Sequence, residues 1–376
     1  MIPRSVLVLT HELPPLGGGA GRAMSQLCLA LREKGIRMEV WTQKPPAAAR
    51  REFPFHVRYF ATGRTVQFQT NILTILLYSA RVLVSGLFLG RGKPDLILSN
   101  TAIPTGGVGA FLGWILGVPH VIWYHGADVH ENRPQGAGLL YRLFLKAAWK
   151  NTSLHCFVSK GLLALAEGYG GMKSPRMVLP LFADHVIPGQ ASPQGKRVFL
   201  FTGRLEKVKN PFLFIRAIQS LHEEKCLPTD VGFRIVGGGA LFAPLRERIR
   251  EAGLASLVSL EAPVSGESMS AIYASAYALV LTSVVEGFPL TIMEAALCGV
   301  PSIGSDTLGI NEEIEDGGTG LLFPRDDSGA CAKAILRLLD EEGLRDRLGK
   351  NARDSARAHS AKKSAAILLE SLERLG

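Results

Sequence analysis

Two glutamates eight residues apart, Glu286 and Glu294, have the clearest potential for chemistry in this 376-residue chain. They bracket the sequence Glu-Gly-Phe-Pro-Leu-Thr-Ile-Met-Glu, which follows a short apolar run at residues 278–282 that is typical of a buried strand. Pro289 suits the first turn of a helix, because the amide hydrogen that proline lacks would have no partner there. The sequence therefore predicts Glu286 at the mouth of a helix and Glu294 further along it.

Glu294 is the only charged residue between Gly287 and Ser305. A carboxylate is costly to bury without partners, so we expect Glu294 either to meet a hydrogen-bonding ligand or to lie on an exposed edge. Eight residues of helix rise about 12 Å, which is the scale of a nucleotide-diphosphate sugar from its sugar to its ribose. The helix N-terminus between the acids would then hold the pyrophosphate. The alternative is an acid near a helix N-terminus followed by an ordinary helical glutamate.

Two cations follow the strand predicted at residues 197–202. Arg204 comes directly after Gly203, and Lys209 is five residues further on. Two positive charges at the carboxyl end of a strand can neutralise a pyrophosphate leaving group. Basic side chains before a helix are also often simply solvated, and this alternative stays open.

Glycine-rich loops follow two predicted strands. Gly18 and Gly19 come after the strand at residues 5–10, and Gly238 comes after the strand at residues 232–236. Such loops let the backbone approach a phosphate or a sugar closely. The first loop lacks the third glycine of G-x-G-x-x-G and is not followed by Gly-Lys-Ser/Thr, which argues against a nicotinamide oxidoreductase and against a Walker loop. A flexible turn is the alternative.

His125 is the histidine best placed by topology, because it directly follows the strand predicted at residues 120–124 in the sequence His-Gly-Ala-Asp. A histidine at a strand end can donate a hydrogen bond to a sugar hydroxyl or a phosphate. A structural histidine is the alternative.

Strand and helix patterns alternate along the whole chain. Predicted strands lie at residues 5–10, 38–42, 56–60, 95–99, 120–124, 154–159, 177–179, 197–202, 232–236, 258–261, 278–282 and 301–305, and predicted helices include residues 21–34, 138–150, 211–224 and 290–298. This order predicts an α/β protein with two doubly wound, Rossmann-like parallel-sheet domains, at residues 1–185 and 190–376. The stretch 180–193, rich in Pro, Gly, Ser and Ala, is the expected linker. The active site is expected in the cleft between the domains, where ligands meet the carboxyl ends of strands.

The segment from Asn71 to Gly90 contains one charged residue, Arg81. Its length and composition suggest a membrane span, but its polar residues recur at steps of three and four and so share one stripe of a helix. We therefore expect an amphipathic helix, either covered within the domain or lying on a membrane surface.

Charge is unevenly distributed. Residues 1–180 contain 20 Lys and Arg against 8 Asp and Glu, whereas the remainder contains 22 against 25. The first half is therefore expected to face an anionic partner or a membrane surface, and no motif supports nucleic acid. The alternative is that the charge only keeps the protein in solution. Five cysteines without C-x-x-C spacing fit a reducing cytosol and argue against a disulfide scaffold or a zinc site. The N-terminal apolar run is too short for a signal peptide.

Together these residues resemble retaining glycosyltransferases of the GT-B type, specifically glycosyltransferase family four. The resemblance is strongest over residues 197–327, and its motifs are the E-x7-E pair Glu286/Glu294, Gly203-Arg204 with Lys209, Gly299-Val300-Pro301, Asp306, Gly309, Glu312 and Gly320-Leu321-Leu322-Phe323-Pro324. The amino half matches more loosely, through the glycine loop and His125-Gly126. The chain departs from the family at Ala276-Tyr277 and Thr282-Ser283. These positions do not identify the donor.

The resemblance implies two facing domains, with the second holding a nucleotide-diphosphate sugar and the last helix able to cross back to the first. It assigns Glu286 to the donor-sugar hydroxyls, Glu294 to the ribose, Arg204 and Lys209 to the diphosphate, Gly18 and Gly19 to the phosphates, His125 to the sugar, and Gly238, Gly287, Phe288, Pro289 and Leu290 to the rest of the donor site. Glu286, His125, Arg204 and Lys209 are the expected catalytic residues. No metal and no separate cofactor are expected, because the cations and the helix terminus replace the metal.

The sequence thus predicts retaining transfer of a hexose from a UDP- or GDP-sugar to a saccharide, in the synthesis of cell-surface polysaccharide or lipopolysaccharide-type glycans. The charge of the first half suggests a lipid-linked acceptor and a cytoplasmic protein at the inner membrane face. The alternatives are a nucleotide-sugar epimerase of the same architecture and a non-catalytic protein that binds glycans or nucleotides.

Overall fold

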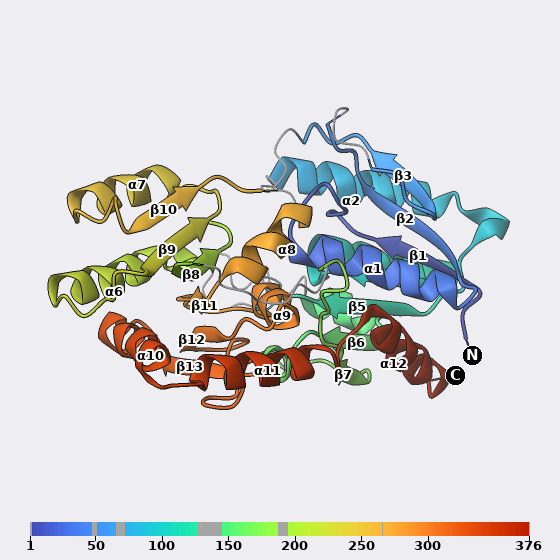
Figure 1. Cartoon of the computed structure of the whole chain (residues 1–376). Coiled ribbons are helices and arrows are strands. Elements are labelled where there is room, and N and C mark those ends of the chain that lie inside the picture. The colour runs from blue at the N-terminus through green and yellow to red at the C-terminus, as the bar shows by residue number, and fades with distance from the viewer. Residues whose placement is uncertain are drawn as a thin grey trace. The chain divides into compact units, whose positions relative to one another are not determined.

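The structure is a computed structural model of the whole chain, and it describes residues 2–46, 51–64, 72–126, 129, 145–186, 195–264 and 266–375. The chain divides into two compact units (Figure 1). The first unit contains Met1–Leu181 and Ser360–Gly376, and the second contains Phe182–His359. The division between units therefore falls inside the expected linker, four residues before the end predicted for the first domain, and the C-terminal segment belongs to the first unit.

The first unit is built on a seven-stranded parallel sheet with the strand order β3-β2-β1-β4-β5-β6-β7. Its strands are β1 (Ser5–Leu9), β2 (Arg37–Gln43), β3 (His56–Phe60), β4 (Leu96–Asn100), β5 (His120–Tyr124), β6 (Leu154–Phe157) and β7 (Arg176–Val178). Every residue of β1, β4, β5 and β6 is buried. Strands that are buried throughout are typical of a parallel sheet covered on both faces.

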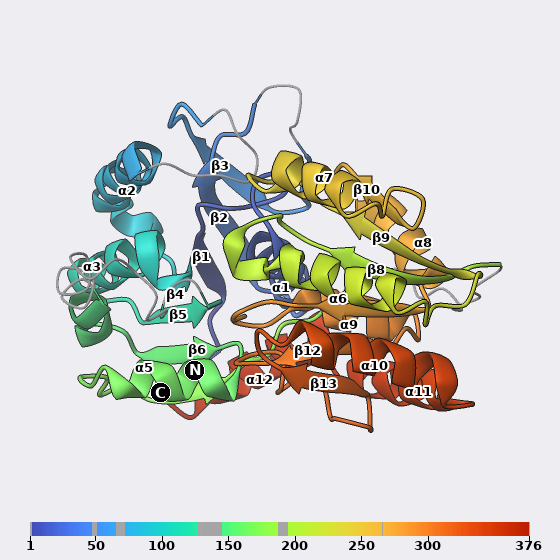
Figure 2. The same ribbon diagram turned by 90° about the vertical axis from the view of Figure 1, so that its left-hand side faces the viewer.

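Helices of the first unit flank this sheet (Figure 2). They are α1 (Gly19–Glu33), α2 (Ile72–Leu87), α3 (Gly107–Leu116), α5 (Lys160–Gly168) and α12 (Ala361–Glu373), with short helical turns at η2 (Gly90–Gly92) and η3 (Ala102–Gly106). Ser159 caps α5 by accepting a hydrogen bond from the Leu162 amide, and Ser360 caps α12 in the same way. The last helix contacts α1, where Lys362 forms an ion pair with Glu33.

The second unit has a six-stranded parallel sheet with the order β10-β9-β8-β11-β12-β13. Its strands are β8 (Arg197–Thr202), β9 (Val231–Val236), β10 (Val258–Glu261), β11 (Ala278–Leu281), β12 (Ser302–Asp306) and β13 (Gly320–Pro324). Its helices are η4 (Lys207–Lys209), α6 (Pro211–Glu223), α7 (Phe242–Glu251), α8 (Gly266–Ser275), α9 (Leu290–Leu297), α10 (Ser328–Asp340) and α11 (Leu344–Ala356). Phe199, Phe214 and Ile235 lie in its apolar core, between the sheet and its helices.

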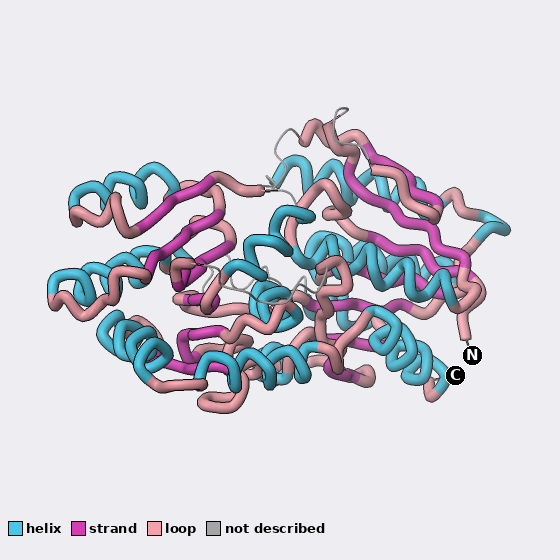
Figure 3. The backbone as a smooth tube through the Cα atoms, viewed as in Figure 1, coloured by secondary structure: helices cyan, strands magenta, loops and turns pink. Residues whose placement is uncertain are grey.

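The strand pairing confirms the two predicted parallel sheets, whose strands are magenta in Figure 3. The predicted strands agree with the structure within one or two residues, and helices lie between them as predicted, but β13 was not predicted as a strand. Of the helix predicted at residues 138–150, residues 145–150 are helical, and the rest lies outside the described residues.

Both sheets reverse their strand order beside their first strand. In the first unit β1 pairs with β2 and β4, and in the second unit β8 pairs with β9 and β11. Ligands of doubly wound folds bind at such switch points, outside the carboxyl ends of the strands. The loops after β1, β4, β8 and β11 are therefore the places where substrate-binding residues are expected.

Helix α2 confirms the predicted helix at residues 71–90 but buries only a narrow side of itself. Thr74, Tyr78, Val82 and Gly86 are its buried residues, and the Tyr78 hydroxyl donates to the backbone oxygens of Thr10 and Trp41 at 3.0 and 2.7 Å. Arg81 of the predicted polar stripe is exposed, as are most of the apolar side chains of the helix. In the described part of the chain, no helix has both the length and the apolarity needed to cross a membrane.

Candidate functional site

Glu286 lies in the loop after β11 and is held by two side chains. Its Oε1 atom accepts a hydrogen bond from Ser283 Oγ at 2.6 Å and forms an ion pair with Lys209 Nζ. The two members of the ion pair are mostly buried, with side-chain exposures of 11% for Glu286 and 20% for Lys209. The structure therefore brings together the acid and the cation that sequence reasoning placed at one site.

Hydrogen bonds fix the backbone that carries Lys209 to the end of β11. Thr282 Oγ1 donates to the carbonyl oxygens of Lys209 and Asn210 at 3.0 and 2.8 Å, and the Val284 amide donates to the Val208 carbonyl at 2.8 Å. The loop after β8 and the loop after β11 are therefore joined by the Thr282 side chain and by one main-chain hydrogen bond. The position of Lys209 beside Glu286 follows from this connection and does not depend on the ion pair alone.

The loop after β12 supports Glu286 from the other side. The Glu286 amide donates to the Leu308 carbonyl at 3.1 Å, and Thr307 Oγ1 donates to the Val284 carbonyl at 2.7 Å. Gly309 has a φ of +83°, and a Cβ atom there would lie 2.5 Å from the Glu286 carbonyl oxygen. Glycine is therefore required at residue 309 both by conformation and by space.

Arg204 does not join this cluster in the structure. Its guanidinium is half exposed, with a side-chain exposure of 55%, and it forms an ion pair with Glu206 at 3.2 Å. Arg204 nevertheless follows β8 at the switch point, on the same loop as Lys209. Gly238 lies in the loop after β9 and accepts a hydrogen bond from the Leu205 amide at 2.9 Å, so this loop packs against the one that carries Arg204.

Glu294 is buried with partners from its own unit, which excludes the exposed edge that the sequence had left open. Its side chain is 4% exposed. Oε1 lies 2.8 Å from His185 Nε2, and Oε2 accepts a hydrogen bond from the Tyr273 hydroxyl at 2.6 Å. These two contacts hold the carboxylate in one orientation, which an apolar stretch by itself would not provide.

Helix α9 begins at Leu290, and Pro289 is its N-cap residue. The sequence had predicted Pro289 in the first turn, one position further into the helix. The side chains of Phe288 and Leu290 are 7% exposed, and Pro289 is also buried. Any contact of this segment with a substrate would therefore come from its backbone or from Gly287. The helix start lies between Glu286 and Glu294, as predicted.

In the first unit, His125 follows β5 and is bonded to the end of β4. Its Nε2 atom lies 2.6 Å from Asn100 Oδ1, and Asn100 Nδ2 donates to Thr10 Oγ1 at 3.0 Å. A carbonyl oxygen cannot donate, so Nε2 carries the proton. Burial, together with the nearby His11, lowers the pKa of His125 to about 3. The ring is thus neutral at physiological pH, and its N–H is directed to Asn100. Ala127 and Asp128 lie outside the described residues.

The glycine loop of the first unit ends at the N-terminus of α1. Gly18 is the N-cap residue, Gly19 is the first helical residue, and the Gly18 amide donates to Glu12 Oε2 at 3.3 Å. The other oxygen of Glu12 lies 3.8 Å from the guanidinium of Arg64, whose side chain is 1% exposed. A carboxylate therefore occupies the position at which an anion would approach these amides.

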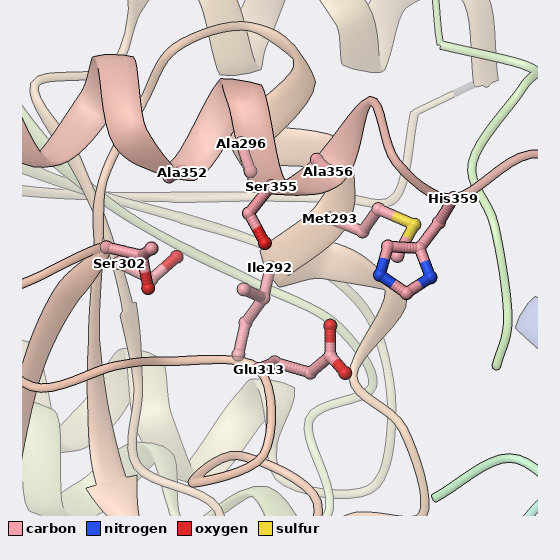
Figure 4. A pocket seen from close by; sticks show the side chains of 10 residues that line it. Ile292, Met293, Ala296, Ser302, Glu313, Ala352, Ser355, Ala356 and His359 are labelled. Carbon is pink, nitrogen blue, oxygen red and sulfur yellow. The ribbon is translucent and has the colours of Figure 1, made fainter. Parts of the chain in front are cut away.

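A separate pocket of the second unit lies between α9, α11 and the loop after β12 (Figure 4). Glu313, Ser302, Ser355 and His359 line it, and burial together with neighbouring Glu312 raises the pKa of Glu313 to about 8. None of the predicted site residues lines this pocket. In the described residues, no group of three or more His, Cys, Asp or Glu side chains could hold a metal ion.

Sequence reasoning missed the residues that orient the predicted ones. They are Ser283 for Glu286, His185 and Tyr273 for Glu294, and Asn100 for His125. Ser283 stands three residues before Glu286, and this proximity is a signal that could have been used. The other three contacts join residues 21 to 109 positions apart, which only folding brings together.

Two family models match the chain, one in each unit. The model described as "Glycosyl transferase 4-like domain" matches residues 18–181, and the model described as "Glycosyl transferases group 1" matches residues 184–355. A D-inositol 3-phosphate glycosyltransferase of Paenarthrobacter aurescens is 32% identical over 174 residues. This alignment covers 46% of the chain and 42% of that protein, so the matched part spans less than half the length of this relative.

Solved structures show the same fold over the whole chain. Sucrose-phosphate synthase from Thermosynechococcus elongatus has a TM-score of 0.81 at 21% identity, covering 99% of this chain and 98% of that one. The Anabaena protein Alr3699/HepE, solved in complex with UDP and glucose, has a TM-score of 0.79 at 20% identity, covering 99% and 100%. At these identities the likeness concerns the arrangement of the elements.

Proposed function

Because the chain belongs to the family-four-like glycosyltransferases with the GT-B fold, we propose that it transfers a hexose from a UDP- or GDP-sugar to a saccharide acceptor with retention of configuration and without a metal. The observation that carries this proposal is the contact of Glu286 with Lys209 and Ser283 at the switch point of the second unit. An acid and a cation held together at this position match the two needs of a diphosphate sugar, which are hydroxyl recognition and charge neutralisation.

Glu286 would accept hydrogen bonds from hydroxyls of the donor sugar. One of its oxygens already has two partners, which leaves the other free to be the main acceptor. Lys209 would turn toward the diphosphate when the donor binds, since two phosphates carry more negative charge than one carboxylate. Arg204, on the same loop, would supply the second positive charge. These cations stabilise the departing diphosphate in the role that a metal ion has in other enzymes.

Glu294 would bind the ribose. Its carboxylate contacts His185 and Tyr273, and a carboxylate can accept about four hydrogen bonds, so we propose that it also accepts from a ribose diol. His185 and Tyr273 would fix the carboxylate before the donor arrives, which lowers the entropy cost of binding. The backbone from Gly287 to Leu290 would contact the diphosphate at the start of α9.

In this mechanism the leaving phosphate helps to deprotonate the acceptor hydroxyl on the face that the sugar bond leaves. No separate protein nucleophile is then required. For the first unit we retain His125, Gly18 and Gly19 as proposed substrate contacts. A neutral His125 whose Nε2–H is directed to Asn100 would accept a hydrogen bond at Nδ1, not donate one as the sequence suggested.

The acceptor is proposed to be a saccharide, lipid-linked in its natural setting, in the synthesis of a cell-surface glycan. The excess of basic residues in the first 180 positions supports an anionic acceptor or membrane surface. Peripheral attachment at the inner membrane face would place the enzyme beside such an acceptor.

The test compares nucleotide and nucleotide-sugar binding in two matched variants. UDP, UDP-glucose, GDP, GDP-mannose and NAD are screened by thermal shift; a ligand at about 100-fold its Kd stabilises by roughly 2.7 kcal/mol. In Glu286→Gln the extra stabilisation by the sugar conjugate over the free diphosphate should vanish, and transfer should fall by at least about a hundredfold. Glu261→Gln, which breaks the ion pair with Arg234 at the end of β10, is the control.

Stabilisation by NAD alone would refute the proposal. Conversion of the nucleotide sugar to its epimer, without an acceptor, would favour the epimerase alternative. Donor binding that Glu286→Gln leaves unchanged would show that the site has been placed wrongly.

A further inference from the structure

Exposed apolar side chains of the first unit gather on two neighbouring helices. Of fifteen large apolar residues that are exposed among the described residues, ten lie between residues 72 and 115. We call them the apolar patch: Ile72, Leu73, Leu76, Leu77, Val84, Leu87, Phe88, Phe111, Trp114 and Ile115. Phe88 is 84% exposed, Ile72 is 76% exposed and Trp114 is 65% exposed. Contiguous exposed apolar surface on this scale marks an interaction site.

Buried hydrogen bonds fix the orientation of α2 in the fold. Tyr78 on its buried side donates to the backbone of Thr10 and Trp41, and Gln43 Nε2 donates to the Thr74 carbonyl at 3.1 Å. Tyr78 is 1% exposed. Rotating the helix to bury its leucines would break these buried hydrogen bonds. Each donor or acceptor left buried without a partner would lower the stability of the fold. The fold therefore holds the leucines of α2 in solvent.

Helix α3 extends this surface, because it packs closely on α2. A Cβ atom at Gly86 would lie 2.5 Å from Leu112 Cδ2, so the two helices approach through a glycine. Their contact is visible in Figure 2, where α2 and α3 lie next to each other. Phe111, Trp114 and Ile115 are exposed on α3 itself, which makes the apolar patch a two-helix surface.

The charged residues of α2 and of the turn before β4 that lie beside the apolar patch are basic. Between Glu52 and Asp95 the sequence contains five basic residues and no acid, of which Arg64 is buried against Glu12, and α3 has no charged residue. Arg81 is exposed on α2, and exposed Lys93 donates from Nζ to the Leu116 carbonyl at the end of α3. An apolar surface with a cationic rim complements a bilayer with anionic headgroups.

We propose that the apolar patch docks this protein on the surface of an anionic lipid bilayer, with α2 and α3 lying in the headgroup region. This docking proposal adds the membrane-binding elements to the proposed function. It rests on the proposed function only in assuming that the acceptor is lipid-linked. A two-fold dimer through the same face is disfavoured, since α2 and α3 contain no acid that could pair with Arg81 of the second copy. Trp114 suits the interface, because its ring is amphipathic.

The first test is co-sedimentation of the full chain with vesicles of phosphatidylcholine alone or with 30% phosphatidylglycerol (about this fraction suffices). We expect binding to the anionic vesicles that weakens as salt is raised. The double variant Leu76→Ser/Phe88→Ser should bind about a hundredfold more weakly, roughly tenfold for each buried side chain. Leu29→Ser/Ile367→Ser removes two exposed apolar side chains from other helices of the same unit and should bind like the unchanged protein.

The second test uses tryptophan fluorescence as a local probe. Trp114 is exposed, whereas Trp41, Trp123 and Trp149 are at most 1% exposed. Insertion should therefore shift the emission to shorter wavelength and allow quenching by brominated lipids. Trp114→Phe should keep vesicle binding and lose both signals.

Equal binding by the Leu76→Ser/Phe88→Ser variant, or an unchanged Trp114 spectrum with bound vesicles, would overturn the proposal. Self-association in sedimentation velocity that the double variant abolishes, without vesicle binding, would assign the apolar patch to a second copy of the chain instead. Donor binding is read separately by the UDP thermal shift, which the patch variants should not alter. A protein that does not bind vesicles would therefore leave the transferase proposal standing. A protein that UDP does not stabilise would leave the docking proposal standing.

Discussion

Lys209 Nζ and Glu286 Oε1 form an ion pair across 77 residues of sequence, within the second unit. Thr282 and Val284 hold the Lys209 backbone at the end of β11, so both partners are positioned by the same strand end. A donor diphosphate would compete for the lysine. The pair thus keeps a cation at the site while neutralising it until an anion arrives.

Replacing Lys209 by alanine should lower kcat/KM for transfer about a hundredfold, because one of two cations that face the leaving group is lost. Lys209→Arg should recover part of the rate, since it restores the charge with different geometry. The control is Lys207→Ala, which removes an exposed lysine of the same helical turn. Steady-state kinetics with a UDP-sugar measure the effect, and an equal loss in both alanine variants would contradict the role of Lys209.

The contacts of Glu294 predict a specific effect on ribose recognition. Glu294→Gln should weaken binding of UDP while leaving 2′-deoxy-UDP or 3′-deoxy-UDP little changed, because only the intact diol uses the carboxylate. Tyr273→Phe removes the hydrogen bond to Oε2 and should raise the donor Kd by a smaller factor, about fivefold, with the same selectivity. Isothermal titration measures these affinities. Equal losses for UDP and its deoxy analogues would rule out the ribose contact.

Gly309 should not tolerate alanine. Its φ of +83° disfavours a side chain, and the added Cβ atom would meet the Glu286 carbonyl. We expect Gly309→Ala to destabilise the protein by about 1–3 kcal/mol and to reduce kcat through displacement of Glu286. Gly317→Ala is a matched control, because residue 317 also has positive φ but open space around its Cα. Chemical denaturation of both variants separates the clash from the backbone strain.

His125 should stay neutral over the working pH range of the enzyme. Burial lowers its pKa from 6.5 to about 3, so the unfolded chain takes up the proton first as pH falls. The stability contributed by the neutral ring is therefore complete above about pH 6.5 and is lost progressively below it. The ring resonances should show no titration between pH 8 and 5 in NMR spectra. Asn100→Asp, which places a carboxylate beside Nε2, should raise this pKa and bring the titration into view.

The contribution of Glu313 to stability should depend on pH in the opposite direction. Burial and Glu312 raise its pKa from 4.5 to about 8, so the folded protein retains a proton that the unfolded chain releases. Its stabilising contribution is present below about pH 4.5 and is lost as pH rises through 8. Glu313→Gln should remove this loss, making the variant more stable than the unchanged protein at pH 8 by on the order of a kcal/mol or more. Glu312→Gln should give a smaller effect, and denaturation at pH 5 and pH 8 measures both.

The sequence alone determined the fold class and the positions of the main chemical groups. Short apolar runs that alternate with amphipathic segments are typical of parallel strands covered by helices, and this pattern placed Glu286, Arg204 and Lys209 after strand ends. The pattern missed β13, Gly320–Pro324, because a five-residue run with glycine and proline at its ends reads equally as a loop.

Only the tertiary structure decided which partner each group meets and which face of a helix is buried. Glu294 has His185 as a partner from 109 residues away, and no local pattern encodes such a contact. Periodicity predicted helix α2 but not which of its residues are buried, since that depends on the backbone acceptors of Thr10 and Trp41, to which the Tyr78 hydroxyl donates. Thr74, Tyr78, Val82 and Gly86 are buried, whereas most of the leucines are exposed. The types of the side chains and their spacing can be read from the sequence, whereas the distances between groups remote in sequence are determined only when the sheets fold.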